Sequence, residues 1–217
     1  MSPVRTIPKN HLVVTGRHAT ARTKGGSADF ESTLEKEYML LLDFDPRVVC
    51  YEAQPVRLPL SKGRSYVPDL LVTYDADLSE DRITCELVEV KAQSDLDKNA
   101  EDYREKFETA EEYCEERGWR FVIRTEHDIR THRLQALKFL RRYRNLEADP
   151  EREAQLLEAV TRTAGRCTVT ALLEAIASSP EERAHYAAPL WRLVAVQHIK
   201  IDLDAMIRPD SIVWLED

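Results

Sequence analysis

The stretch Ile83-Thr84-Cys85-Glu86-Leu87-Val88-Glu89-Val90-Lys91 predicts a β-strand that ends in an acid and an amine. Side chains two positions apart on a strand point to the same side, so Glu89 and Lys91 share a face whose earlier residues are apolar. Charged groups at the end of an apolar face need polar partners, and a divalent cation with bound water is a suitable one. The strand therefore predicts a cation site at its carboxyl end.

Two further acids precede this strand in an informative order. Asp69 stands at the head of the apolar part of the preceding predicted strand, before Glu89 in the chain. Upstream, residues 29–43 predict a helix, and position alone does not choose between Glu31 and Glu35 as the acid that faces the strands. A helix acid, a strand Asp and a strand Glu-x-Lys, in that order, are typical of restriction-endonuclease-like phosphodiesterases.

The chemistry of phosphodiester hydrolysis explains these residue types. The reaction needs an activated water and stabilised charge on the phosphoryl and leaving oxygens, which bound Mg²⁺ can supply. Mg²⁺ prefers hard oxygen ligands, so we expect Asp69 and Glu89 to bind it, with the Val90 carbonyl as a third ligand. Glu35 would reach the metal from the helix, and Lys91 would hold the attacking water and offset developing negative charge.

Each residue also has an ordinary structural explanation. Asp69 fits an acid beside a turn on an edge strand, and Glu89 with Lys91 fits an exposed pair on a strand. The order and spacing of the whole set, rather than any single residue, favour a catalytic site.

The order of predicted elements indicates an α/β fold. Three consecutive strands followed by a crossover helix and a fourth strand give a mixed sheet flanked by helices. The predicted elements are an irregular basic arm over 1–28, a helix over 29–43 capped by Asp29, strands over 47–52, 66–74 and 83–91, a turn at 61–63, a helix over 98–117 with Tyr103, Phe107 and Tyr113 inward, a strand over 119–124 and a helix over 126–145.

A charged segment with Pro150 predicts a linker, and we place a domain boundary near residue 149. The catalytic domain would then cover residues 29–149, and a smaller domain would cover 150–217. The smaller domain shows a helical pattern at 169–176, another that begins near Pro189, and short strands at 199–203 and 211–215. This pattern fits a winged-helix module and, equally, a helical cap on the first domain.

Composition sets broad limits on function. The four cysteines are widely separated and form no C-x-x-C pair, so we expect reduced, buried thiols and no zinc site. The absence of a long apolar run or an apolar leader favours a cytoplasmic protein without membrane spans. A net charge of −8 argues against simple DNA binding, although residues 1–28 lack acids and residues 119–144 are rich in arginine. These basic stretches are either solvated faces or contact surfaces.

Several blocks of sequence lie in a fixed order that resembles the TnsA family, the endonuclease subunits of heteromeric cut-and-paste DNA transposases. Beyond the predicted linker the resemblance weakens, although residues 190–203 resemble the C-terminal winged-helix region of that family. The blocks are residues 30–35, 42–46 with Val48, 51–55, 66–69, 88–91, 119–121 and 125–130.

The resemblance implies a role for each site residue. Glu35 corresponds to the helix acid, Asp69 to the bridging metal ligand and Lys91 to the catalytic lysine. Glu89 falls at a position where either Glu or Gln is expected. A TnsA-type subunit nicks the 5′ strand at double-stranded transposon ends with Mg²⁺, for which Mn²⁺ can substitute.

The resemblance also implies partners. A TnsB-type transposase would cut and join the 3′ ends, and a TnsC-type AAA+ ATPase regulator would contact the C-terminal domain. The protein would be bacterial and associated with the nucleoid during transposition. An acidic subunit is compatible with this role, because tethering by partners raises its effective concentration at DNA.

Two other functions use the same residues. A stand-alone restriction, repair or phage-defence endonuclease would cut DNA without partners and should carry a stronger basic face. A non-catalytic DNA- or protein-interaction module would retain the fold, but an intact set of acids with Lys91 speaks against it.

Overall fold

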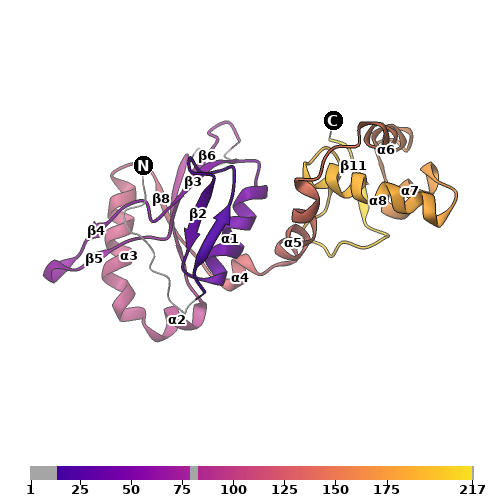
Figure 1. The fold of residues 1–217 in the computed structure, drawn as a ribbon. Helices are drawn as coiled ribbons and strands as arrows, with labels where there is room; N and C mark the ends of the chain where they lie inside the picture. The colour runs from indigo at the N-terminus through magenta and orange to yellow at the C-terminus, as the bar shows by residue number, and fades with distance from the viewer. Residues whose placement is uncertain (1–13, 79–82, 217) are drawn as a thin grey trace. The chain divides into compact units, whose positions relative to one another are not determined.

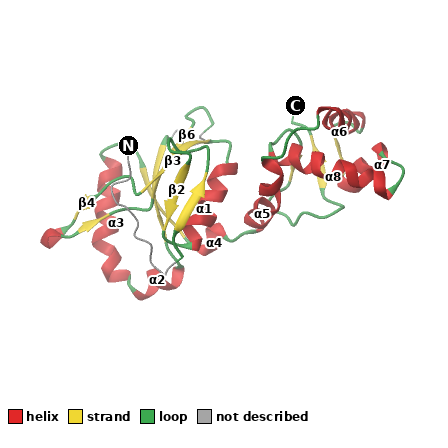
Figure 2. Ribbon diagram, viewed as in Figure 1, coloured by secondary structure: helices red, strands yellow, loops and turns green. Residues whose placement is uncertain are grey.

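The computed structural model describes residues 14–78 and 83–216 and divides the chain into two compact units, Met1–Arg130 and Thr131–Asp217 (Figure 1). Each unit contains its own sheet and helices (Figure 2). Within the described residues, no helix is both long and apolar enough to cross a membrane.

A four-stranded mixed sheet forms the centre of the first unit. Its strands lie in the order β3 (Val48–Ala53), β6 (Leu70–Tyr74), β7 (Cys85–Val90) and β8 (Arg120–Arg124). The first three pair antiparallel, whereas β7 and β8 are parallel because helix α3 (Ala100–Glu115) lies between them in the chain. The mixed sheet flanked by helices that the sequence predicted is confirmed (Figure 2).

Helices α1 and α3 lie on opposite sides of this sheet (Figure 1). Leu87 of β7 packs in a cluster with Ala110 and Cys114 of α3. The adjacent Glu86 points to the other face, where its charge acts on Tyr38 of helix α1 (Thr33–Phe44). The alternation of β7 therefore directs Glu89, two residues after Leu87, to the α3 side.

An N-terminal hairpin replaces the irregular arm predicted over residues 1–28. Its antiparallel strands are β1 (Gly16–Ala19) and β2 (Ser27–Phe30), while residues 1–13 of the predicted arm lie outside the described residues. Gly26 has a φ of 70° in the turn, a conformation that glycine adopts readily. The prediction was wrong because strands of four residues are too short to show a clear alternation.

Helix α1 begins later than predicted. Ser32 is its N-cap, whereas Asp29, the predicted cap, lies in β2. Near the other end of the helix, Asp43 fixes the hairpin: His18 Nε2 lies 2.8 Å from Asp43 Oδ2, and the Thr20 hydroxyl donates to Asp43 Oδ1 at 2.6 Å. The hairpin is thus attached to the helix through buried polar contacts.

A short hairpin precedes β6. Its strands are β4 (Leu58–Pro59) and β5 (Ser65–Tyr66), joined through a 3₁₀ turn over Ser61–Gly63 as the sequence predicted. The strand predicted over residues 66–74 is divided between β5 and β6 by Pro68, which has no N–H to give to a strand ladder.

The helix predicted over residues 98–117 corresponds to α3, preceded by a separate helix α2 (Gln93–Lys98). Its fully buried residues are small, Ala110 and Cys114. The three aromatic residues that were predicted to point inward are only half-buried: Tyr103, Phe107 and Tyr113. The expected aromatic stripe therefore covers the edge of the core rather than its centre.

The cysteines agree with the prediction in one respect. All four are free, but only Cys114 is fully buried, whereas Cys50, Cys85 and Cys167 are half-buried. The position of Cys85 explains its partial exposure, because it is the first residue of β7, before the strand enters the core.

The second unit is a small three-stranded sheet with helices. All its strand pairs are antiparallel, in the order β10-β11-β9. The elements in chain order are α5 (His132–Arg144), α6 (Pro150–Arg162), β9 (Arg166–Thr168), α7 (Val169–Ile176), α8 (Pro180–Ala195), β10 (Lys200–Ile201) and β11 (Ile212–Trp214).

The division between the units falls at Arg130, earlier than the predicted boundary near residue 149. The helix predicted over residues 126–145 breaks there into α4 (Glu126–Ile129) and α5. Helix α5 packs within the second unit, where the Phe139 and Trp191 rings meet edge to face with centroids 5.1 Å apart. The sequence placed this helix in the catalytic domain because local periodicity does not show which core a helix joins.

Two prolines have different roles from those predicted. Pro150 was assigned to a linker, but it is the first residue of α6, where Asp149 provides the N-cap. A proline fits this position because the first N–H groups of a helix have no partner within it. Pro189 was expected near a helix start, but it lies inside α8, which begins at Pro180.

Candidate nuclease site

Neighbouring ends of β6 and β7 bring the predicted strand residues together. Leu70 lies opposite Val88 in the antiparallel register, so Asp69 falls beside the end of β7. The Val90 N–H donates to Asp69 Oδ2 at 2.8 Å. This bond fixes the Asp69 carboxylate next to Glu89, which is 3% exposed.

The Lys91 ammonium lies where three of the four predicted metal ligands converge. Its Nζ is 3.0 Å from Glu89 Oε1, 3.5 Å from Asp69 Oδ2 and 3.4 Å from the Val90 carbonyl oxygen. These hard oxygen atoms already surround one positive charge. They suit Mg²⁺, which commonly binds through one or two carboxylates and keeps several waters. Only two of these ligands are side-chain carboxylates, and the third is a backbone carbonyl; in the described ranges, no group of three or more His, Cys, Asp or Glu side chains is arranged to hold a metal by itself.

The two acids predicted on the helix occupy different positions: Glu35 lies in the first turn of α1, whereas Glu31 precedes the N-cap Ser32 and lies outside the helix. Glu31 lines the cavity of about 460 Å³ that also contains Asp69, Glu89 and Lys91. Glu35 is buried, and its Oε2 accepts the Glu31 N–H at 2.8 Å. The charges of Asp69 and Lys91 nevertheless act on its carboxyl. Glu35 therefore accepts a backbone hydrogen bond at the start of α1 and also lies close enough to Asp69 and Lys91 to interact with their charges.

Several buried acids share a single positive charge, that of Lys91. Burial first, and then the charge of Asp69, raise the pKa of both Glu35 and Glu89 to about 7. Burial also raises the pKa of Asp69, against the opposing effects of Lys91 and the Val90 N–H. Burial disfavours the charged form of Lys91, but the adjacent carboxylates outweigh it and raise its pKa. One ammonium cannot neutralise all these acids, and a divalent cation would supply the missing charge.

Two residues without a predicted role also form the site. The Tyr66 hydroxyl donates to Glu89 Oε2 at 2.7 Å and so orients that carboxylate. The Gln54 N–H donates to the Asp69 carbonyl oxygen at 2.8 Å, and its side-chain Nε2 donates to Glu31 Oε1 at 3.0 Å. Both belong to sequence blocks noted above, but nothing in their spacing marks a Tyr or a Gln as functional.

Two cations contribute to the wall of the same cavity. The Arg57 guanidinium donates to the Ser65 hydroxyl at 3.0 Å, and Lys106 of α3 lies 4.7 Å from the Tyr103 ring centroid. Neither cation forms an ion pair with a carboxylate of the described residues. Such cations are suited to contacts with phosphate oxygens.

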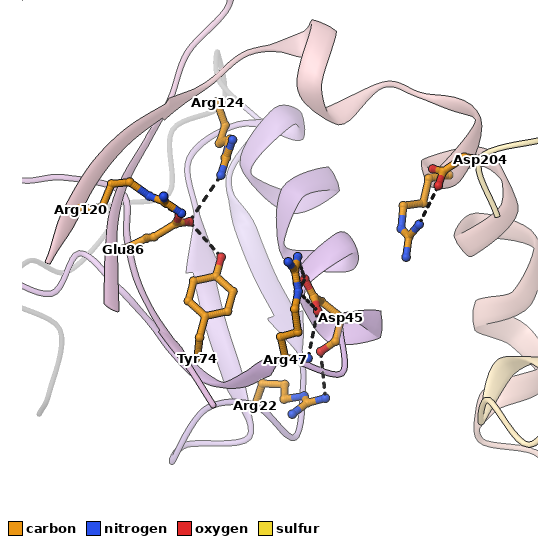
Figure 3. A network of polar contacts seen from close by, with 9 residues as sticks. Arg22, Asp45, Arg47, Tyr74, Glu86, Arg120, Arg124 and Asp204 are labelled. Atoms are coloured by element: carbon orange, nitrogen blue, oxygen red, sulfur yellow. Dashed lines mark hydrogen bonds and ion pairs between the residues drawn. The ribbon is translucent and has the colours of Figure 1, made fainter. Parts of the chain in front are cut away.

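Arginines at the start of the basic stretch 119–144 serve the fold instead. Glu86 accepts from Arg120 at 2.6 and 2.9 Å and lies 3.4 Å from Arg124, while the Tyr74 hydroxyl donates to it at 2.9 Å (Figure 3). The Glu86 side chain is only 2% exposed, so these donors satisfy a buried charge. These two arginines therefore act as ion-pair partners within the sheet.

The second unit carries a separate, largely apolar groove of about 430 Å³. Helices α5, α7 and α8 line it together with the segment before β11. Its residues include Phe139, Leu173 and Trp191, and Met206 beside them is 52% exposed. A groove of this kind is suited to an apolar segment of a partner protein.

A mixed sheet flanked by helices, with Asp69 and a Glu-x-Lys segment on neighbouring strands, is consistent with the class of restriction-endonuclease-like nucleases. Comparison with family models gives a more specific similarity: residues 45–126 match the TnsA-like endonuclease N-terminal domain. This part of the chain is therefore similar to a TnsA-type nuclease domain, and the similarity supports a hydrolase that acts on DNA. The match includes Asp69, Glu89 and Lys91 and begins after Glu35. No curated protein matched the chain.

Proposed function

We propose that this protein is the endonuclease subunit of a heteromeric cut-and-paste transposase and nicks the 5′ strand at transposon ends in a Mg²⁺-dependent reaction. The supporting observation is the convergence of oxygens from Asp69, Glu89 and Val90 on one cation position. This position lies within the TnsA-like domain. The shortage of positive charge around it favours a divalent cation.

Each residue of the cluster has a separate task in this proposal. Asp69, Glu89, the Val90 carbonyl and Glu35 would hold Mg²⁺ or Mn²⁺. When bound, the metal would polarise the phosphoryl oxygens and lower the pKa of its water. Lys91 would orient the attacking water and stabilise the negative charge that develops on the phosphate.

DNA would approach the cluster along the cations of the cavity wall. Arg57 and Lys106 would contact backbone phosphates of the DNA at the cavity. Such contacts position DNA without reading its sequence. Because the chain as a whole carries a net charge of −8, most of its affinity for transposon ends would come from tethering by partners.

The second unit would provide this tethering. Its order of helix, strand, two helices and two strands, from α6 to β11, supports a winged-helix module. The apolar groove beside Met206 supports docking of a TnsC-type AAA+ ATPase regulator. A TnsB-type transposase would cut the complementary 3′ strand.

The test is strand-specific cleavage of a plasmid that carries transposon ends, with Mg²⁺ and the partner proteins present. Wild type should nick the 5′ strand, and Asp69→Asn should abolish nicking while the protein remains folded. Asp77→Asn, an exposed aspartate after β6, is the matched control and should retain activity. Equal nicking by wild type and Asp69→Asn would overturn the site. Efficient cleavage without partners would instead favour a stand-alone endonuclease.

A further inference from the structure

A buried hydrogen-bond acceptor in the nuclease cavity has no partner. Gln54 is 7% exposed, and its Oε1 accepts no hydrogen bond from the described residues. Buried polar atoms in folded proteins are nearly always paired, because an unpaired one loses its bonds to water without compensation. Since Gln54 forms part of the wall that contains Asp69 and Glu89, a ligand of this cavity can supply the missing donor.

The backbone at Gln54 is held in a conformation that few side chains adopt. Its φ is 50°, in the left-handed region that favours glycine. The bond from its N–H to the Asp69 carbonyl oxygen ties this position to the start of β6. Backbone strain of this type persists where the surroundings enforce it, and it is common at ligand sites.

Glu31 fixes the orientation of the Gln54 amide. The Gln54 Nε2 donates to Glu31 Oε1 at 3.0 Å, and this bond fixes the amide so that its oxygen is the atom without a partner. An acceptor oxygen among acids repels phosphate oxygens. It is suited to a hydrogen-bond donor that belongs to a cation, such as a water molecule bound to a hydrated metal ion.

We propose that Gln54 and Glu31 extend the cation site: Gln54 Oε1 accepts hydrogen bonds from water bound to the divalent cation, and Glu31 is a positioning residue for the amide. This inference rests on the metal-dependent function proposed above. Removing a group that orients the ligands of a metal typically weakens metal binding about 10- to 100-fold. Removal of the Gln54 side chain should weaken metal binding by an amount in this range. Substitution of Glu31 should weaken metal binding because the Gln54 amide is no longer held in place.

Isothermal titration of the full-length protein with Mn²⁺, without DNA, tests the proposal. Gln54→Gly removes the side chain and suits the positive φ, so it should leave a folded protein whose Mn²⁺ affinity is at least about tenfold weaker. Gln197→Gly is the matched control, because Gln197 has a φ of 65° in the second unit. This control should bind Mn²⁺ as wild type does.

Two Glu31 variants separate positioning from charge. Glu31→Gln retains an oxygen that accepts from Gln54 Nε2, whereas Glu31→Leu does not. Glu31→Leu should therefore weaken Mn²⁺ binding more than Glu31→Gln. Equal losses in the two variants would overturn the positioning role.

Asp69→Asn distinguishes this inference from the proposed function. If wild type and Asp69→Asn bind Mn²⁺ equally, the metal site itself fails. If Asp69→Asn loses binding while Gln54→Gly keeps wild-type affinity, only the role of Gln54 is overturned. Gln54→Asn provides a second variant that tolerates positive φ and withdraws the amide, and it should also bind Mn²⁺ more weakly.

Discussion

The cavity of the first unit and the groove of the second expose opposite kinds of surface. The cavity holds buried acids around a single lysine, and burial raises the pKa of Glu35 and Glu89 to about 7. The groove is largely apolar and includes the exposed Met206. Incompletely neutralised acids favour a cation, whereas exposed apolar surface favours a protein partner. The comparison supports catalysis in one unit and docking in the other.

Among the variants that distinguish the two surfaces, Lys91→Met should have the largest effect, and it separates catalysis from metal binding. Lys91→Met should slow nicking by about 100-fold or more, since a charge that stabilises the transition state is lost. The same variant should bind Mn²⁺ more tightly, because the ammonium no longer lies among the oxygens of Asp69 and Glu89. Single-turnover nicking and isothermal titration measure the two effects, with exposed Lys98→Met as the control. Weaker Mn²⁺ binding by Lys91→Met would contradict this account of the cation position.

A charged substitution in the apolar groove tests whether the groove binds the ATPase regulator. Met206→Asp should weaken binding of the ATPase regulator about tenfold or more, because an interfacial anchor is lost and a charge is desolvated. Leu146→Asp is matched to it, since Leu146 is also an exposed apolar residue of the second unit, at 43% against 52%. Surface plasmon resonance should show a loss for Met206→Asp alone. Equal affinities for the two variants would remove the groove from the docking surface.

The cations of the cavity wall should have a smaller effect that depends on salt. Arg57→Ala and Lys106→Ala should each weaken DNA binding several-fold and reduce the slope of log affinity against log salt by about 1. Arg104→Ala, on the same helix as Lys106 but paired with Glu101, is the control and should change neither quantity. An unchanged salt slope in the first two variants would mean that these cations do not touch phosphates.

Asp43 should give the smallest effect, confined to stability. Burial opposes its ionisation, but hydrogen bonds from His18, Thr20 and Tyr51 outweigh burial and hold its pKa below the usual value of 3.8. A lowered pKa contributes stability above the unfolded value, and this contribution is lost as the pH falls through the folded value. Urea unfolding should therefore show Asp43→Asn less stable than wild type at pH 7, with a smaller difference near pH 3. A difference that does not change with pH would contradict this assignment.

The alternation of side chains along the strands made it possible to predict the central sheet and the site residues on β7 from the sequence. The apolar face of β7 ends at Glu89 and Lys91, and a period of two fixes their common side without tertiary information. The mixed topology followed from three strands and a crossover helix. The role of Gln54 could not be predicted in this way, because it arises from contacts with Glu31 and Asp69, which are distant in sequence.

The second unit shows why local signals were insufficient elsewhere. Asp149-Pro150 is an N-cap followed by a first-turn proline, but the same residues also fit a charged linker, and α6 was missed. Helix α5 shows a clear helical pattern, yet only the packing of Phe139 on Trp191 reveals that it belongs to the second unit. Residue periodicity predicts an element, whereas its packing partner depends on the rest of the chain.

The central claim is that Asp69, Glu89 and the Val90 carbonyl form a cation site, and anomalous diffraction from a crystal soaked in Mn²⁺ tests it most directly. The account predicts an anomalous peak among these oxygens, at about 2.1 Å from the carboxylates. It also predicts that the Lys91 ammonium is displaced from its position between them. A map with the ammonium still in place and no peak at these oxygens would contradict the account.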